Sequence, residues 1–209
     1  MAAAVKGQIS PRQARANATR ARIIASAYAL FCESGYRGTT MESIAERAGV
    51  AVQTVYFTFR TKDDLLQAVY QWAVLGDEGT PPPMQDWNVT ALAGPDARNA
   101  IPAIVAGIAT IHARVAPLLP VFDAISPEPA GAIHRRSEDL RRSDMTKLVS
   151  VLARKTPLRK GMTRRHAADL IFVLTGPRSY QSFVLEAGWP PRDWVRWVTA
   201  TLRHDLFGD

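Results

Sequence analysis

Apolar residues recur at spacings of three and four along most of the chain, which is the pattern of amphipathic helices. Glycines and prolines divide this pattern into segments of ordinary helical length. The expected helices cover residues 17–34, 39–48, 52–59, 61–75, 96–115, 117–125, 130–155, 162–187 and 190–207. The sequence therefore predicts an all-α protein.

Two of these helices are short and follow each other closely, between Thr39 and Lys62. We expect a capping box at the start of the first, with the Thr39 hydroxyl on a free backbone amide and Glu42 reaching back. Gly49 follows the last residue of this helix, where a left-handed conformation is commonly needed. Two short helices with a tight glycine turn between them indicate a helix-turn-helix.

The second short helix is expected to bury one face and to expose a patterned one. Val55 and Phe59 lie four residues apart and so share a side of the helix. An amide, two hydroxyls and an aromatic ring point the other way, and these groups suit base edges in the major groove, with Tyr56 on the flank placed for a phosphate. The predicted DNA-contacting residues are Thr39, Thr40, Gln53, Thr54, Tyr56, Phe57, Thr58 and Lys62.

The spacing of these residues also resembles a known family. The run G-x-x-x-T-T-x-x-x-I-A-x-x-A-G-V-x-x-x-T-V-Y-x-x-F-x-x-K-x-x-L, from Gly35 to Leu65, is similar to the DNA-binding domain of the tetracycline-repressor (TetR) family. The resemblance covers about the first 70 residues. Two positions depart from the commonest pattern: Ala51 replaces a Ser or Thr, which weakens the cap of the second helix, and Gln53 replaces a small residue.

The resemblance implies a three-helix, helix-turn-helix DNA-binding domain followed by a helical ligand-binding and dimerisation domain. We expect a basic, flexible arm over residues 1–16, the DNA-binding domain over 17–62, and the effector-binding and dimerisation domain over 63–209. In the family, the last two helices pair with those of a second subunit. The same pairing would explain the excess apolar surface of residues 162–207, so a homodimer is expected there.

Charge is distributed unevenly between these domains. Residues 1–62 hold nine of the 26 Lys and Arg but only three of the 19 Asp and Glu, which accounts for +6 of the net charge of +7. A basic domain joined to a nearly neutral one is typical of a nucleic-acid module attached to another function. The arm is expected either to be a disordered tail or to wrap the DNA and insert an Arg into the minor groove.

The candidate ligand-contacting residues in the second domain are Trp72, Ile108, His112 and Phe172. Their apolar and aromatic character favours a small hydrophobic or aromatic effector. The alternative is that all four simply fill the core, and that His112 is a satisfied histidine on an apolar helix face. The proline-rich stretch 76–94 is expected to be a surface loop, and Gly176-Pro177 should kink or interrupt the helix over 162–187.

Several function classes receive no support from the sequence. There is no G-x-S-x-G, H-E-x-x-H, C-x-x-C or glycine-rich phosphate loop, so an enzyme is not expected and no cofactor is implied. The four histidines share no metal-ligand spacing. A single cysteine and no visible signal peptide or membrane span suggest a cytoplasmic protein. The prediction is a ligand-responsive repressor that binds palindromic operator DNA as a dimer; the alternative is a constitutive DNA-binding dimer.

Overall fold

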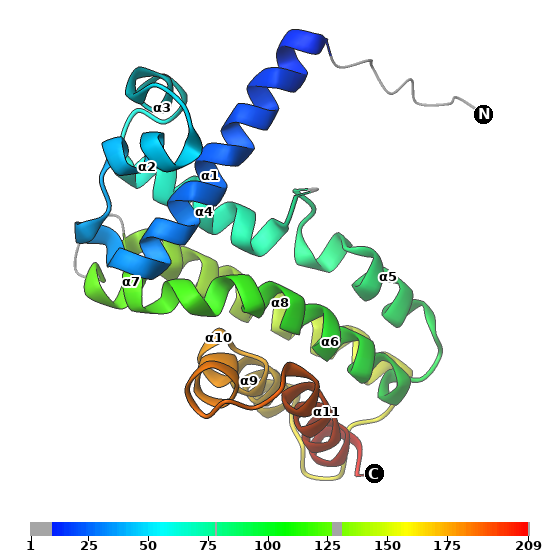
Figure 1. Ribbon diagram of the computed structural model, residues 1–209. Helices are drawn as coiled ribbons and strands as arrows, with labels where there is room; N and C mark the ends of the chain where they lie inside the picture. Colours follow the sequence, from blue (N-terminus) through cyan, green and yellow to red (C-terminus); the bar gives the residue numbers. More distant parts are fainter. Residues whose placement is uncertain (1–9, 78, 127–130, 209) are drawn as a thin grey trace. The chain divides into compact units, whose positions relative to one another are not determined.

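The computed structural model describes residues 10–77, 79–126 and 131–208, and within these ranges every regular element is helical. The prediction of an all-α protein is therefore confirmed. Contacts divide the chain into two compact units, one ending at Val69 and the other beginning at Tyr70. Figure 1 shows the order of the helices along the chain.

The first unit is built on α1 (Pro11–Gly38), which packs against α2 (Met41–Ala48), while α2 in turn packs against α3 (Val52–Thr58). Ile23, Ala27 and Phe31 of α1 lie four residues apart and are all fully buried, as are Ile44 and Val55 opposite them. Gly35 breaks α1 with a φ of 68°, a value that favours glycine, so the predicted stop at this position is present.

The start of α1 corrects one expectation. Residues 10–16 were assigned to a flexible arm, but α1 begins at Pro11, with Ser10 as its N-cap accepting a hydrogen bond from the Gln13 amide at 3.2 Å. Pro11 suits the first turn of α1, where its missing N–H has no partner to lose. The rest of the predicted arm, residues 1–9, lies outside the described residues.

Helix α4 (Lys62–Leu75) begins in the first unit and ends in the second. Its N-terminus is capped as expected, since the Thr61 hydroxyl accepts from the Asp64 amide at 3.0 Å. Leu65, Leu66 and Val69 have no exposed surface. The division between the units falls after these residues, further along the chain than the predicted boundary at 62/63.

The second unit centres on α6 (Ala97–Val115), which packs against α5 (Asp86–Ala93) and α11 (Pro191–Phe207), while α8 (Ala132–Lys155) packs against α9 (Arg164–Leu174). Trp194 of α11 is fully buried in this core, together with Ile101 and Leu152. Shorter elements complete the unit: η1 (Pro82–Met84), η2 (Ala116–Leu118), α7 (Leu119–Ala124), α10 (Pro177–Tyr180) and a π-helical turn, η4 (Gln181–Glu186).

Helix α5 was not expected, because residues 76–94 were assigned to a loop. It is held to α6 by Trp87, whose indole lies against Gly107: a Cβ added at Gly107 would come within 2.1 Å of the ring. The Trp87 indole N–H also donates to the Gln85 side chain at 2.6 Å. Trp87 thus packs on the body of the second unit, and the segment around it is helical.

The last part of the chain is interrupted as predicted. Helix α9 ends at Leu174, and Pro177 starts α10, so the backbone carbonyls just before Gly176 lose their intrahelical partners. Two side chains replace those partners. His112 of α6 bonds the carbonyl of Thr175 at 2.7 Å, and Arg141 of α8 donates to the carbonyl of Phe172, also at 2.7 Å.

One segment, Ala97–Ala124, is long and apolar enough to cross a membrane by length and composition, with a mean hydropathy of 1.6. Two thirds of its most apolar window is buried inside the protein, however. Ile104, Val105 and Ile108 contribute to the same core as Trp194. The segment, which comprises α6, η2 and α7, therefore belongs to the core of the second unit.

Candidate nucleic-acid interface and effector region

The turn between α2 and α3 has the geometry that the sequence predicted. Gly49 adopts a left-handed conformation, with φ 64° and ψ 44°. Its N–H donates to the carbonyl of Glu46 at 3.1 Å, and the N–H of Val50 donates to that of Ala45 at 3.0 Å. These two bonds end α2 in a Schellman motif and direct the chain at once into α3.

Helix α3 presents the expected division between a buried and an exposed face. Val55 is fully buried and Phe59, the C-cap, is 4% exposed. On the other side Gln53 is exposed, Tyr56 is 46% exposed and Phe57 is 92% exposed. The Phe57 ring is thus nearly free of protein contact on this seven-residue helix.

The cap of α2 differs from the prediction by one residue. The N-cap is Thr40, whose hydroxyl accepts from the Ser43 amide while the Ser43 hydroxyl accepts from the Thr40 amide, each at 3.1 Å. Thr39 is fully buried and donates to the carbonyl of Gly35 at 2.8 Å. The Thr39 hydroxyl is thus turned into the protein, and Glu42 takes no part in the capping box. The predicted roles of Thr39 and Glu42 in the cap of α2 are therefore wrong.

The remaining predicted DNA contacts are placed as follows. Tyr56 donates to the carboxylate of Glu42 at 3.4 Å. Thr58 donates to the carbonyl of Thr54 at 2.7 Å, and both of these threonines are partly exposed. The Lys62 ammonium donates to the carbonyls of Tyr36 and Thr39 at 2.9 Å each. Two of its three protons are therefore used inside the domain.

Helix α3 also has the weak start expected from Ala51. This residue is the N-cap and has no side chain that can accept a hydrogen bond. Only the backbone carbonyl of Ala51 contributes, accepting from the Thr54 amide at 2.9 Å.

His112 is the most unusual of the four predicted ligand residues. Because a carbonyl can only accept, the bond to Thr175 places the ring proton on Nε2. Nδ1 is then an acceptor, and it is buried without a hydrogen-bond partner among the described residues. Burial, and secondarily the charge of Arg141, lower the pKa of His112 from 6.5 to about 4. The ring is therefore neutral at pH 7.

The other three predicted ligand residues do not gather around His112. Ile108, one turn earlier in α6, is buried in the core cluster. Phe172 lies on α9 with the guanidinium groups of Arg141 and Arg142 3.6 and 4.0 Å from its ring centre. Trp72 donates its indole N–H to Asp77 at 2.7 Å. Ile108 and His112 thus lie one turn apart on the same side of α6, and the Phe172 backbone is bonded by Arg141, whose charge also acts on His112.

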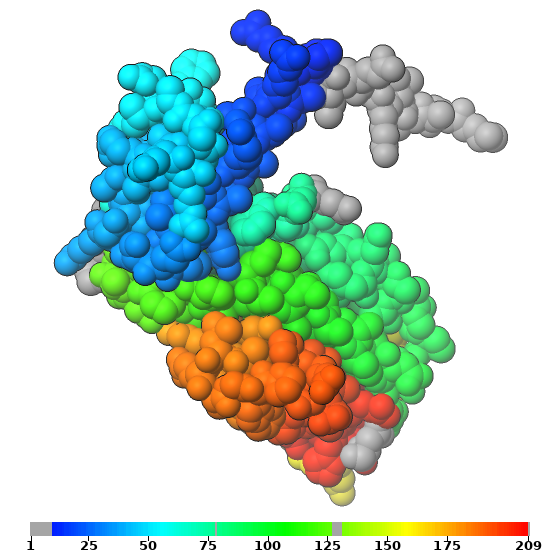
Figure 2. All heavy atoms as spheres, in the orientation of Figure 1, coloured from blue at the N-terminus to red at the C-terminus, as the bar shows by residue number. Residues whose placement is uncertain are grey.

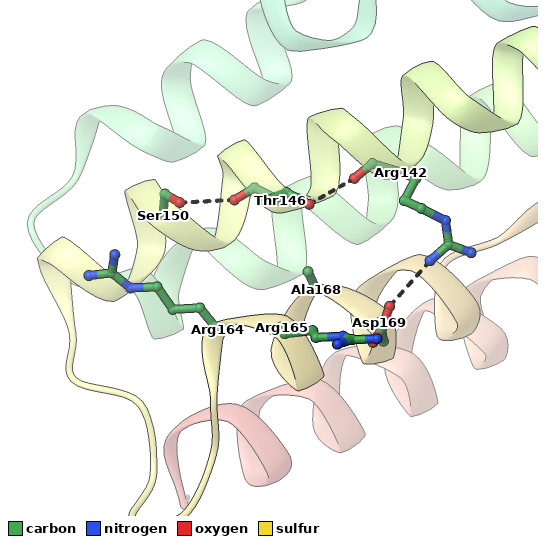
Figure 3. Close-up of a pocket in the computed structure, with 7 residues that line it drawn as sticks. All are labelled: Arg142, Thr146, Ser150, Arg164, Arg165, Ala168 and Asp169. Carbon is green, nitrogen blue, oxygen red and sulfur yellow. Dashed lines mark hydrogen bonds and ion pairs between the residues drawn. The ribbon is translucent and has the colours of Figure 1, made fainter.

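A hollow of about 430 Å³ lies between α8 and α9 (Figure 3). Its lining is mostly polar or charged, with an ion pair of 3.2 Å between Arg142 and Asp169 at one end. The residues that line it are Arg142, Thr146, Ser150, Arg164, Arg165, Ala168 and Asp169. None of the four predicted ligand residues is among them.

The predicted site residues do not include an inward-facing polar group that lies on α8. Glu138 and Arg141 form a bidentate pair at 3.0 and 2.7 Å, with 28% and 18% of their side chains exposed. His134 lies on the same helix as Glu138 and Arg141, and its Nδ1 is 3.2 Å from the hydroxyl of Tyr70 on α4. A signal was available, since His134, Glu138 and Arg141 continue the three- and four-residue spacing that leads to the buried Leu148.

The described residues contain no group of three or more potential metal ligands.

An incompletely covered aromatic cluster lies near the C-terminus. Phe183 lies 4.8 Å from Trp189 and 4.7 Å from Trp197, measured between ring centres. Near it in sequence, Val173 is 64% exposed, Leu185 48% and Trp189 36%.

Comparison with known proteins agrees with this arrangement. Residues 23–69 match the family model described as bacterial regulatory proteins, tetR family. A stretch of 51 residues is 39% identical to the uncharacterized HTH-type transcriptional regulator YvkB of Bacillus subtilis (strain 168), covering 24% of this chain and 27% of that protein. The sequence match thus spans about a quarter of either protein.

Among solved structures, the fold is similar to NalD, the secondary repressor of the MexAB-OprM multidrug efflux pump in Pseudomonas aeruginosa. The TM-score is 0.67 and the identity 18%, over 92% of this chain and 98% of that one. It is also similar to the fatty acid degradation regulator FadR from Bacillus halodurans, with a TM-score of 0.66 and 18% identity, over 88% and 94% of the two chains. These relatives are described as regulators and not as enzymes. The helix-turn-helix of the first unit thus matches the tetR family of bacterial regulatory proteins, and the fold along most of the chain is similar to that of these solved regulators.

Proposed function

We propose that the protein is a ligand-responsive transcriptional regulator, and that it acts as a repressor by occupying palindromic operator DNA as a dimer. The observation that carries this proposal is the exposed face of α3, where Gln53 and the almost fully exposed Phe57 lie opposite the buried Val55. An amide that can pair with adenine and a ring that can meet the thymine methyl suit the major groove. Operator binding places the protein in the cytoplasm.

Dimerisation through residues 162–207 is supported by the apolar surface of α9, η4 and α11. Val173, Leu185 and Trp189 are more exposed than such side chains usually are in a covered core. A two-fold dimer carries two copies of α3, which can enter successive major grooves when they lie about 34–36 Å apart. The spacing of the two copies is therefore the quantity that an effector would change.

The effector is proposed to be a small hydrophobic or aromatic compound bound in the second unit. Support comes from the unpartnered acceptor at His112 and from the repressor and regulator functions named for the two solved relatives. If the effector prefers a dimer with another spacing of its α3 helices, it must weaken DNA binding by the same factor by which DNA weakens effector binding. Helix α4, which begins in one unit and ends in the other, is the expected connection.

The alternative is a constitutive DNA-binding dimer. Two observations favour it: Ile108 and His112 are buried in the core, and the hollow between α8 and α9 is not lined by any of the four predicted ligand residues. Under this alternative the second unit only dimerises.

Replacing Gln53 with Ala is expected to change which operator sequences are bound, at a cost of about 1–3 kcal/mol for the lost base contact. Gln53 is exposed at the start of α3, so its loss should not affect folding. Selection of preferred sites from a random duplex library, carried out with the parent and the variant, measures the effect.

Tyr56→Phe is the matched control, because it removes one hydroxyl from the flank of the same helix. It should weaken binding to all sites alike, since phosphate contacts carry no sequence information. If Gln53→Ala selected the same preferred site as the parent, the assignment of Gln53 to base reading would fail.

Ile108→Ala and Phe172→Ala separate the regulator from the constitutive alternative. Ile108 is 8% exposed, and as a core residue it should cost about 2–5 kcal/mol of unfolding free energy when truncated. Phe172 is only partly buried between two arginines and should cost less. Thermal unfolding measures the stability of both variants, and a second assay measures whether any of a panel of hydrophobic compounds releases the protein from operator DNA. Large destabilisation with no responsive compound would leave the constitutive dimer.

A further inference from the structure

The first three turns of α1 extend beyond the core of the DNA-binding unit. From Pro11 to Arg22, a segment called here the α1 extension, no side chain is buried, and the first buried residue is Ile23. At 1.5 Å per residue, these twelve positions make a rod of about 18 Å. Figure 2 shows the end of this rod standing clear of α2 and α3.

We propose that the α1 extension lies along the phosphate backbone of DNA outside the base pairs read by α3, and so lengthens the operator site. This inference rests on the proposed function, because it assigns a second contact with the same partner. It differs from a flexible arm that inserts into the minor groove, since the segment is a helix continuous with the scaffold of the domain.

The charge of the segment supports this assignment. The first 32 residues of the sequence contain no Asp or Glu. Arg12, Arg15 and Arg22 are spaced by three and seven, which places them on one side of the helix over a length of about 15 Å. All three are exposed, and none has an ion-pair partner among the described residues. B-DNA carries one phosphate charge per about 1.7 Å of its axis, so a stripe of this length meets several phosphates.

The extension has few of the interactions that usually stabilise a surface helix, among them one i,i+4 hydrogen bond from Gln13 Nε2 to Asn17 Oδ1 at 3.1 Å. It buries no side chain, it carries no acidic residue in its first turn, and its arginines repel one another and the positive end of the helix dipole. What favours the helix is its composition, with Ala at positions 14, 16, 18 and 21 and a Ser10 cap. A polyanion along the arginine stripe would offset the repulsion among these arginines and with the positive end of the helix dipole.

Arg20 fixes the extension relative to α3. Its guanidinium lies 4.5 Å from the ring centre of Phe59, the C-cap of α3, on a different side of α1 from the stripe. Because α1 continues past this contact toward its N-terminus, the arginine stripe begins beside the end of the recognition helix. Contacts made there would fall on flanking phosphates, which position a protein but carry no sequence information.

An anionic membrane is the other polyanion that a basic helix can meet. Helices that lie in a membrane surface bury Trp, Phe or Leu on their apolar face. Between Pro11 and Arg22 the largest apolar side chain other than proline is alanine. This composition favours DNA.

The test is a triple variant of the full chain, Arg12→Gln, Arg15→Gln and Arg22→Gln, titrated with a random-sequence duplex of about 40 base pairs between about 50 and 200 mM salt. The slope of log K against log salt is expected to become shallower by about one for each lost phosphate contact, up to about three. On a site selected with the parent, trimming the flanking base pairs should weaken the parent and leave the triple variant unchanged.

Two controls accompany the triple variant. Lysine at the same three positions should keep the parental slope, because charge and not side-chain shape is required. Gln at the exposed Arg136, Arg154 and Lys160 of the second unit, all outside residues 162–207, removes the same charge and should leave the slope unchanged. Circular dichroism compares the helix content of all the variants.

The outcomes distinguish this inference from the proposed function. If the parent binds no duplex, the proposed function fails. If the parent binds and the Gln variant keeps both its slope and its sensitivity to trimming, the inference is overturned while the function stands. Binding of the parent to phosphatidylglycerol vesicles, lost in the Gln variant with an unchanged DNA slope, would assign the extension to a lipid surface.

Discussion

Lowering the pH from 7 to 4 is expected to destabilise the second unit by up to about 3 kcal/mol through His112 alone. Burial lowers the pKa of His112 from 6.5 to about 4. The unfolded chain therefore takes up the proton first as the pH falls, and the free energy of unfolding decreases between these two values. Above pH 6.5 this histidine makes no pH-dependent contribution.

His112→Gln isolates this effect, because glutamine keeps an N–H that can reach the carbonyl of Thr175 but does not titrate. Urea unfolding of the parent and the variant at pH 7, 5.5 and 4.5 should show a shallower pH dependence for the variant. The pKa of His134 is also lowered, chiefly by burial, but that residue is present in both proteins and its contribution cancels. His166→Gln, at an exposed position, is the control. Equal pH dependence of the parent and His112→Gln would contradict the assignment.

Leu185→Asp is expected to dissociate the proposed dimer, with a loss of dimer affinity of more than about 100-fold. A carboxylate placed in an apolar interface loses its hydration and gains no partner. Operator affinity should fall when the dimer dissociates, since a single subunit cannot engage both half-sites at once. Sedimentation velocity measures the oligomeric state, and fluorescence anisotropy with a selected duplex measures binding.

Leu140→Asp is the matched control, because Leu140 is also an exposed leucine, at 68%, but lies on α8 outside residues 162–207. This variant should remain dimeric. A Leu185→Asp protein that sediments like the parent would place the subunit interface elsewhere.

The sequence predicted best the features that depend on neighbouring residues. The four-residue spacing of Ile23, Ala27 and Phe31 sufficed to locate a buried helix face, and Gly49 and Thr61 ended and started helices at the positions expected. These features arise from backbone hydrogen bonding and steric restriction within a few residues.

The errors arise where distant segments decide the structure. Helix α5 forms in a proline-rich stretch because Trp87 finds the surface of α6. Glu138 and Arg141 turn inward because Arg141 can donate to the Phe172 carbonyl, which the Gly176-Pro177 break leaves free. Neither partner is close in sequence.

For the candidate site, the exposed face of α3 followed directly from its periodicity, but the choice between Thr39 and Thr40 did not. Either hydroxyl could cap α2. Which one does so depends on the break at Gly35, because the carbonyl of Gly35 accepts a hydrogen bond from the Thr39 hydroxyl. The ligand residues were chosen for apolar character alone, which core and pocket side chains share. That character could not predict which of them the folded chain brings together.

The contact between Gly107 and Trp87 reverses an ordinary rule for engineering stability. Glycine inside a helix is usually about 1 kcal/mol less favourable than alanine, so Gly→Ala in the middle of α6 would normally be a first choice for a more thermostable protein. Here the new methyl group would occupy the space of the indole. The exchange becomes favourable only if position 87 is made smaller at the same time, so the two positions should be varied as a pair in any directed-evolution library.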